Sequence, residues 1–436
     1  MSLLTTHVVL AVLLSAPATP EADVPTRPMA QLTLPEAIDR ALERSPRVSM
    51  VRAAVQRAEA LVVQSRATWL PTLSLNGTFT QLEGNRGLAD RVLLPAQSGG
   101  ANLQLNVPLL SVPRWLSTQQ AQLAVDASAE DEKEVTRVVT SLVGRAWLAV
   151  QLQHKLVAVA ERARVTSAEQ LELATLRYSG GLGTRLDLVR AHRELADNEG
   201  RLARVNAELT TSREVLGVLL GERGPVDISG APEFGPLPAS ADLERVLEAR
   251  PDVAAAEHRV ALALRAVDTS WTDYLPTAGL LLQPTAQSPA TPTQPSLGIT
   301  AQVTGQLVLF DGLARSGARK ERDASLASAR AQSDEVRQRA ESELRLALEV
   351  LSLRGASARA ADASAKWALE ANVLARAAWK EGASTNIELI EAERAARDAE
   401  SLAEVARTSE WAAQLELLVA AGRGATAASA RRSSAP

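Results

Sequence analysis

Two glutamates, Glu388 and Glu391, are the residues whose type and spacing could do chemistry in this chain. They are three positions apart, so in a helix they lie on one face. They follow a short segment of small residues that predicts a turn. Paired carboxylates at such a place concentrate negative potential and attract cations. The alternative is that a glutamate in the first turn of a helix simply complements the helix dipole.

No catalytic motif accompanies these carboxylates. The sequence has no glycine-rich phosphate loop followed by Lys and Ser or Thr, no His-Glu-x-x-His motif and no Ser/His/Asp triad order. It has no cysteine, which excludes disulfides, thiolate metal sites and cysteine nucleophiles. A net charge of -4 gives no reason to expect nucleic acid. We therefore predict no enzyme activity and no cofactor. We also predict no metal site, because the four histidines are scattered and lack metal-binding spacing: His7, His154, His192 and His258.

The glutamates belong to a stretch that occurs twice. Residues 178–191, YSGGLGTRLDLVRA, and residues 379–392, WKEGASTNIELIEA, each place a glycine three residues after an aromatic residue. Small or polar residues follow, and then an apolar run with an acidic residue near its start. A glycine after an apolar-periodic segment ends a helix, and Thr184 or Thr385 is a helix-start signal. Each stretch is therefore predicted to form the tip of a helical hairpin.

The repeat extends over nearly the whole chain. A shift of about two hundred residues superposes several further motifs in the same order, which indicates one duplicated unit. The matching segments are 44–48 with 249–253, 69–72 with 274–277, 107–111 with 307–311, and the run ending at Gly221 with the run ending at Gly422.

These motifs resemble the outer membrane efflux protein family, of which channels of the TolC type are best known. The resemblance spans residues 32–422 and rests on ordered motifs in both halves. It implies a mainly α fold, in which a long α-helical barrel continues into a twelve-stranded transmembrane β-barrel. A homotrimer would form both barrels, with four strands from each chain. The implied parts are a first repeat at 32–221, a connector at 222–240 that belongs to a belt around the helical barrel, and a second repeat at 241–422.

The two ends of the chain lie outside this resemblance. Residues 1–18 are predicted to be a secretory signal, because 8–14 is a short apolar run and Ala16-Pro17-Ala18 offers a small-x-small cleavage pattern. No Lys or Arg precedes the run, and the alternative is a disordered N-terminus. Residues 423–436 have nothing to bury and are predicted to be disordered.

Helical periodicity dominates the composition. From 34 to 67 apolar residues recur at three and four positions, with a break at Ser45-Pro46. From 114 to 178 there is no proline, so we predict one helix about 95 Å long at about 1.5 Å per residue. The second copy of this long helix is expected at 313–379. Shorter return helices, which could stack end to end with the entering helices, are predicted at 186–220 and 387–420.

Between the helices, the period of the sequence changes to 2. Apolar residues alternate with Ser, Thr, Asn and Gln over segments of about ten residues, which is typical of transmembrane β-barrels. An ordinary hairpin on a soluble core has the same pattern. Four strands cannot close a barrel, and an open edge in hydrocarbon leaves backbone groups unpaired, so spanning strands would require an oligomer. The strands are predicted at about 71–83, 101–110, 275–285 and 296–310.

Aromatic residues mark the junctions between strands and helices. The chain has 7 Trp, 2 Tyr and 3 Phe, and five of these twelve lie at such junctions. Amphipathic rings at one end of every strand would form a girdle at a membrane interface in contact with outer-membrane lipid. A packed joint between sheet and helices would also collect them. The five residues are Trp69, Trp115, Trp271, Tyr274 and Phe310.

The resemblance implies a role for the two glutamates. Glu388 and Glu391 match two acidic residues of the family that line the constricted periplasmic entrance and attract cations. In a trimer they would place six carboxylates around the pore mouth. The family has Asp at these positions, so Glu keeps the charge and lengthens the side chain.

The resemblance also implies a latch between neighbouring tips, in which Asp187 matches an acidic member. The Tyr and Arg partners of the family's latch correspond here to Trp379 and Ser384, and neither can pair with Asp187 as an Arg could. The closed entrance would then be held through Arg185 or Arg190, or less tightly. The latch candidates are Asp187, Arg185, Arg190, Tyr178 and Trp379.

Small residues in both tip turns leave backbone accessible, and the family meets its periplasmic adaptor with these turns. Helix capping alone explains Gly181 and Gly382 fully and the others less well. The candidate docking residues are Gly181, Gly183, Thr184, Gly382, Ala383 and Ser384.

Together these features imply an outer-membrane exit duct with its helical barrel in the periplasm. It would be a passive conduit, opened at its periplasmic tip by its partners. Those partners would be a periplasmic adaptor and an inner-membrane transporter of the RND, ABC or MFS type, in an efflux pump or a type I secretion system. The alternative is a periplasmic coiled-coil scaffold without transport activity, which has no use for two-faced strands flanked by Trp. The sequence does not identify the cargo.

Overall fold

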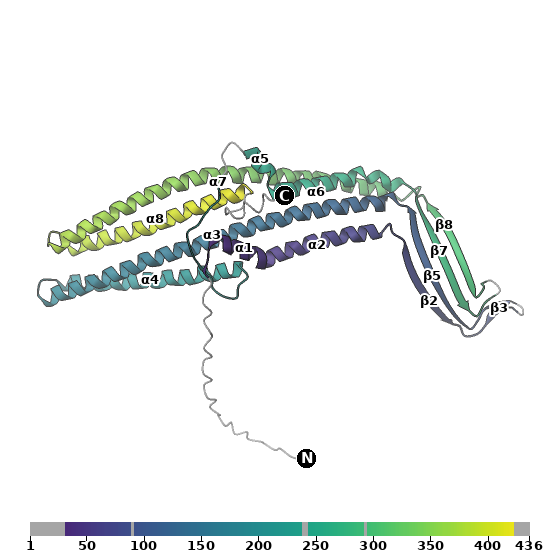
Figure 1. The fold of residues 1–436 in the computed structure, drawn as a ribbon, viewed down its shortest axis with the longest axis horizontal. Helices are drawn as coiled ribbons and strands as arrows, with labels where there is room; N and C mark the ends of the chain where they lie inside the picture. The colour runs from purple at the N-terminus through teal and green to yellow at the C-terminus, as the bar shows by residue number, and fades with distance from the viewer. Residues whose placement is uncertain (1–30, 89–90, 238–242, 292–293, 423–436) are drawn as a thin grey trace, which may run out of the picture.

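The computed structural model describes residues 31–88, 91–237, 243–291 and 294–422. A long helical body ends in a four-stranded sheet that is bent away from the helix axes (Figure 1). The signal predicted at 1–18 and the tail at 423–436 lie outside the described residues. None of the helices in the described ranges is long and apolar enough to cross a membrane.

The helices agree with the periodicity of the sequence to within two residues at each end. Pro46 begins a new helix directly after Ser45, because proline fits the first turn, where its missing N–H costs nothing. The first repeat contains α1 (Leu34–Arg44), α2 (Pro46–Ala67), α3 (Val112–Ser179) and α4 (Arg185–Leu219). The second contains α5 (Leu243–Glu248), α6 (Pro251–Asp268), the 3-10 turn η2 (Ser270–Tyr274), α7 (Ala314–Lys380) and α8 (Asn386–Ala420).

Two short helices flank each long helix. In the first repeat α2 and α4 both pack on α3, and in the second α6 and α8 both pack on α7 (Figure 1). The halves meet where α3 contacts α6 and α8. The end-to-end stacking expected from helix lengths is therefore the arrangement of the molecule.

The largest apolar core lies where the short helices meet beside α3. Trp147 is fully buried there, and its Nε1 donates a hydrogen bond of 3.0 Å to the carbonyl oxygen of Leu32. Leu34 and Ile38 of α1 and Leu216 of α4 complete the cluster. Beside it, strand β1 (Gln31–Leu32) pairs in parallel with β6 (Asp227–Ile228) of the connector, which ties the connector to the body.

The sheet has the order β2-β5-β7-β8, and all its neighbouring strands are antiparallel. Strand β8 was expected to reach residue 310 but ends at Gln306, because its partner strand begins at Thr277, which pairs with Gln306. Strand β5 begins four residues earlier than expected, since Gln97 still pairs with Gln81. The bounds are β2 (Thr72–Gln81), β5 (Gln97–Leu110), β7 (Thr277–Ser288) and β8 (Leu297–Gln306), with an unforeseen short hairpin of β3 (Arg86–Leu88) and β4 (Arg91–Leu94).

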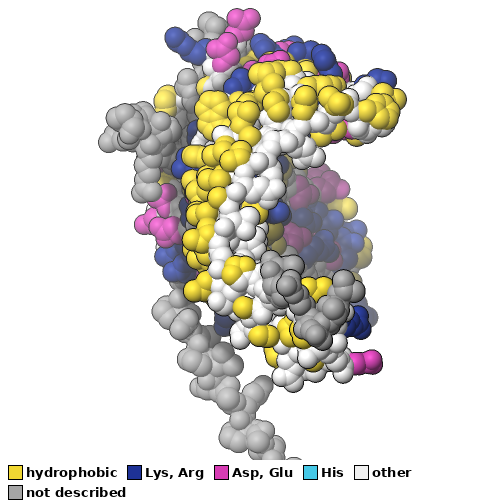
Figure 2. Space-filling view, turned by 90° about the vertical axis from the view of Figure 1, so that its right-hand side faces the viewer, with side chains coloured by type: hydrophobic (Ala, Val, Ile, Leu, Met, Phe, Trp, Pro, Cys, Tyr) yellow, Lys and Arg dark blue, Asp and Glu magenta, His cyan; other side chains and the backbone are white. Residues whose placement is uncertain are grey.

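The register gives the sheet one apolar and one polar face. Leu75 lies opposite Leu103 on the apolar face, while Asn76 lies opposite Asn102 on the other and donates a hydrogen bond of 3.1 Å to it. Leu75 is 75% exposed and Ile299 on β8 is 77% exposed, so no core formed by the described residues covers the apolar face. Figure 2 shows hydrophobic side chains along one side of the sheet and uncharged polar ones beside them. The alternative of a hairpin lying on a core is wrong.

Candidate functional site: the hairpin tips and the sheet junction

The two tip turns have the same backbone geometry. Gly181 and Gly382 adopt φ angles of 73° and 76°, a left-handed conformation that favours glycine. In the first turn the amides of Leu182 and Gly183 donate to the carbonyl oxygen of Arg177 at 2.8 and 3.0 Å, which closes the end of α3. A Cβ on Gly183 would lie 3.1 Å from the nitrogen of Tyr178, so close packing as well as access explains that glycine.

Asp187 is held mainly by its own helix. The Thr184 hydroxyl accepts a hydrogen bond from the Asp187 amide at 3.2 Å and donates one of 2.6 Å to its carboxylate. This contact lowers the pKa of Asp187 below its usual value, with a smaller contribution from Asn386. Asn386, on the other tip, lies 3.5 Å from the carboxylate, and Arg190 lies 3.8 Å from it. Asn386 was not foreseen, because nothing in its local sequence distinguishes it.

Glu388 completes a capping box. Its carboxylate accepts hydrogen bonds from the Thr385 amide at 2.9 Å and the Ser384 hydroxyl at 2.8 Å, and the Thr385 amide is the main reason that the pKa of Glu388 is lowered. Glu391 is exposed one turn later, and its side chain makes no hydrogen bond or ion pair within the described ranges. Capping and charge display are thus compatible, since both carboxylates remain at the surface.

Trp379 has a different partner from the one expected of a latch residue. It is only 7% exposed, and the guanidinium of Arg177 lies 4.0 Å from the centre of its ring. Because Arg177 ends α3 and Trp379 ends α7, this cation–π contact joins the two hairpins. Tyr178 is 44% exposed, and Arg185 makes no side-chain hydrogen bond or ion pair within the part of the chain that is described.

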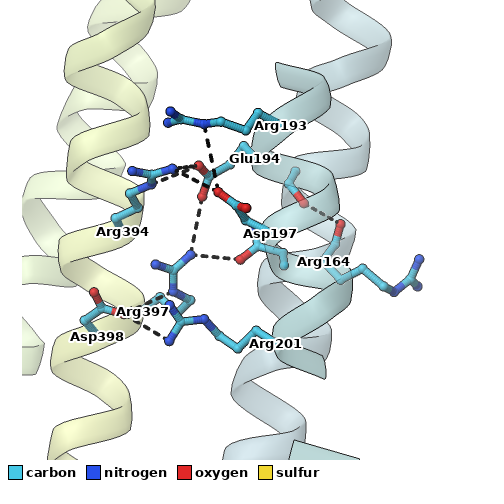
Figure 3. Close-up of polar contacts among 10 residues, drawn as sticks. Arg164, Arg193, Glu194, Asp197, Arg201, Arg394, Arg397 and Asp398 are labelled. Carbon is cyan, nitrogen blue, oxygen red and sulfur yellow. Dashed lines mark hydrogen bonds and ion pairs between the residues drawn. The ribbon is translucent and has the colours of Figure 1, made fainter. Parts of the chain in front are cut away.

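A cluster of charged side chains connects α4 and α8 above the tips (Figure 3). Glu194 of α4 is 4% exposed and accepts hydrogen bonds from Arg394 of α8, one of them at 2.9 Å. Arg397, one turn further along α8, lies 3.4 Å from Glu194 and donates a hydrogen bond of 2.8 Å to Asn198. The sequence contained no signal for this cluster, because its partners are about two hundred residues apart.

The five junction aromatics gather at the helix end of the sheet, as predicted. Trp69 precedes β2, Trp271 and Tyr274 precede β7, and Phe310 follows β8. Arg315 of α7 stacks on Tyr274 at 4.6 Å from the ring centre. All five are exposed in the single chain: Trp69 40%, Trp115 58%, Trp271 57%, Tyr274 48% and Phe310 80%.

Two antiparallel hairpins of long helices continue into a two-faced, four-stranded sheet, which is the architecture that the resemblance predicts for one protomer. Residues 37–222, which are less than half of the chain, match the family described as outer membrane efflux protein. The resemblance found in the sequence, and the outer-membrane localisation that it implies, are confirmed by this match.

Solved structures extend the likeness in fold to the second repeat. The crystal structure of a membrane protein from Pseudomonas aeruginosa superposes with a TM-score of 0.80 at 22% identity, over 95% of this chain and 97% of that one. Because it extends over nearly the whole of both chains, this similarity establishes the fold.

Two named relatives match shorter parts of the chain. Fusaric acid resistance protein FusA of Burkholderia cepacia is 26% identical over 202 residues, which are 45% of this chain and 36% of FusA. Protein CyaE of Bordetella pertussis is 27% identical over 313 residues, which are 66% of this chain and 64% of CyaE. The matched segments thus span less than two thirds of the length of either relative.

Proposed function

We propose that the chain assembles as a homotrimer into a passive outer-membrane exit duct that serves a tripartite efflux pump or a type I secretion system. The observation that carries this proposal is the sheet. It exposes an apolar and a polar face at once, has unpaired outer edges on β2 and β8, and is continuous with the long hairpins.

Assembly would satisfy both properties of the sheet. Pairing of β8 with β2 of the next chain would close a barrel of twelve strands and leave no backbone edge in lipid. The row of Leu75, Leu103 and Ile299 would then face hydrocarbon, and the row that contains Asn76 and Asn102 would face the water-filled interior. The girdle at the helix end of the sheet would lie at the periplasmic interface.

The tips would form the periplasmic entrance. Three copies of Glu388 and Glu391 would surround it with carboxylates, which remain exposed in the single chain. The turns at 180–184 and 382–385 would meet a periplasmic adaptor, which in turn engages an inner-membrane transporter. The division into repeats at 32–221 and 241–422 with a connector at 222–240 stays part of this proposal.

The name of one of the two relatives indicates a kind of cargo. FusA is named for resistance to fusaric acid, which suggests export of a small organic compound. CyaE covers more of this chain but carries no cargo in its name. An RND, ABC or MFS transporter would select the cargo, because we assign the duct itself no binding site.

Adjacent residues on β2 test the assignment of the two faces. Leu75→Lys places a charge on the apolar face and is expected to cost about 2–4 kcal/mol if the residue lies near the bilayer midplane. The matched variant Asn76→Lys places the same charge on the polar face and should assemble normally. The readouts are the yield of trimer extracted from outer membranes in mild detergent and conductance in planar bilayers.

Two outcomes would contradict the proposal. Equal trimer yields for both lysine variants would show that the apolar face does not meet lipid. Release of the unaltered protein by osmotic shock, without conductance, would instead favour the periplasmic scaffold.

A further inference from the structure

The contacts between the two hairpins are few at the tips themselves. The carboxylate of Asp187 accepts its shortest hydrogen bond from Thr184, at the start of its own helix, and it lies 3.5 Å from the side-chain nitrogen of Asn386. The guanidinium of Arg177 also stacks on the ring of Trp379, which joins the two hairpins near the tips. The contact between Asp187 and Asn386 is long and resists separation only weakly, whereas the stack on the buried ring of Trp379 contributes more.

The hairpins are joined more firmly by the α4–α8 clasp, which consists of Glu194, Asn198, Arg394 and Arg397. Glu194 is almost fully buried, and both arginines belong to the other hairpin. Hydrogen bonds between ionised partners are about twice as strong as neutral ones. Separation would break the contacts of Glu194 with both arginines at once.

The surroundings of the clasp show that side chains, rather than closely packed backbones, make this connection. The two hairpins pack on one another chiefly through α3 and α8, whereas α4 reaches α8 through long charged residues (Figure 3). Arg201 of α4 lies 3.7 Å from Asp398, and Arg162 of α3 pairs with Glu400 of α8. Proximity of Glu194 raises the pKa of Arg394, so the arginine stays charged at any physiological pH.

The clasp lies close to the tips, on the two helices that begin there. Glu194 follows Asp187 by seven residues and Arg394 follows Glu388 by six, which places the clasp about 10 Å above the tip turns at about 1.5 Å per residue. Movement of the α7–α8 hairpin away from the α3–α4 hairpin must therefore break the clasp before the tips can part widely.

We propose that the α4–α8 clasp, rather than a tip latch, holds the periplasmic entrance closed within each protomer. The proposal rests on the function proposed above and adds the element that an opening partner must disrupt. It also accounts for the absence of the expected Arg partner of Asp187, because closure does not depend on that contact.

The test is the single-channel conductance of purified trimers in planar bilayers. Glu194→Gln removes the central charge with little change in shape, and the double variant Arg394→Ala/Arg397→Ala removes its partners from the other side. Both are expected to raise the conductance several-fold. Asp187→Asn should leave it near that of the unaltered protein. Glu335→Gln is the matched control, because Glu335 pairs only with Arg339 on its own helix and both are exposed.

Unaltered conductance in both clasp variants, or a larger increase in Asp187→Asn than in either, would overturn the clasp while leaving the channel intact. Absence of any channel in the unaltered protein would instead overturn the proposed function, and the clasp with it. The two clasp variants alter different helices, α4 and α8. If one of them folds poorly, the conductance of the other decides the test.

Discussion

The two copies of the repeat build the same joint between short helices with different side chains. In each copy a glycine in the left-handed conformation follows the return helix and lies against a carbonyl oxygen just before the proline-started helix of the same repeat. Gly221 lies near the carbonyl of Arg44, and Gly422 lies near that of Ala249. The space beside this contact is filled by Trp147 in the first copy. In the second, the buried guanidinium of Arg250 donates to the carbonyl oxygen of Ala420 at 3.0 Å.

This difference shows that the two copies share the backbone geometry of the joint but not the side chains that fill it. Helix ends and turn glycines depend on backbone geometry, which both copies need. The filling of the joint depends only on volume and on satisfying nearby polar groups. Tyr178 and Trp379 are 201 positions apart, so Trp147 corresponds to Leu348, and Gly217 corresponds to Leu418. The first joint thus relies on one large ring, and the second on a buried ion pair.

The largest effect is expected at Trp147. Trp147→Ala should lower the free energy of unfolding of the helical body by about 4 kcal/mol, because it leaves a cavity and removes one of the two hydrogen bonds that the Leu32 carbonyl accepts. Leu348→Ala, at the corresponding position, should cost about 2 kcal/mol, since Leu348 is only partly buried. Thermal unfolding in detergent, followed by helical circular dichroism, measures both. Equal losses would show that the two joints are filled alike.

Arg250 should follow in magnitude. Arg250→Ala strands the carboxylate of Asp252, which lies 2.7 Å from the guanidinium, and is expected to cost about 3 kcal/mol. The same unfolding measurement applies, with Arg245→Ala on the preceding helix as control, since Arg245 makes no side-chain ion pair in the described residues. An Arg250→Ala loss no larger than that of the control would mean that the buried pair contributes nothing.

Gly217 sharpens the comparison through close packing. A Cβ at Gly217 would lie 2.1 Å from the carbonyl oxygen of Gly224, so Gly217→Ala should cost about 1–3 kcal/mol. Gly200 lies on the same helix, where an added methyl group would meet nothing within 4 Å, and Gly200→Ala should raise stability by up to about 1 kcal/mol. Opposite signs in the two melting shifts are the expected result, and a gain at both positions would contradict it.

Acid should weaken the second joint. Burial alone would raise the pKa of Asp252, but its hydrogen bonds with Arg250 outweigh burial and hold the pKa below the ordinary 3.8. A lowered pKa stabilises the fold at pH values above 3.8, and this contribution is lost as the pH falls through the folded-state value. Asp252→Asn should therefore show a smaller fall in melting temperature below pH 3.8 than the unaltered protein. Parallel pH profiles would disprove this assignment.

The smallest structural effect concerns the tips, where the copies differ in charge. Glu388→Gln/Glu391→Gln should abolish cation preference, measured as the reversal potential across a salt gradient. Asp187→Asn should preserve it, because that carboxylate is engaged by Thr184. An unchanged cation preference in the double variant would contradict the proposal that these glutamates form an acidic ring at the entrance.

Much of this fold follows from local pattern. Period 3.6 and Pro46 locate the helices, period 2 locates the strands, and the tip turns follow from Gly181 and Gly382. The contacts that join the halves do not follow, because Glu194 and Arg394 are ordinary members of a chain with 47 Lys and Arg residues. Arg250 likewise belongs to a charged population expected at the surface, and only tertiary packing buries it. The partner of Trp379 depends on the relative position of two hairpins, which periodicity leaves undetermined.

The four strands of the sheet are uncharged along their whole length. Strands β2, β5, β7 and β8 contain no Asp, Glu, Lys, Arg or His. A wall of amides, hydroxyls and alkyl groups has nothing to titrate and holds no fixed counterions. In the proposed channel, any dependence of ion selectivity on acidity would then originate outside these strands, and solutes that have passed the helices would leave the cell without further sorting by charge.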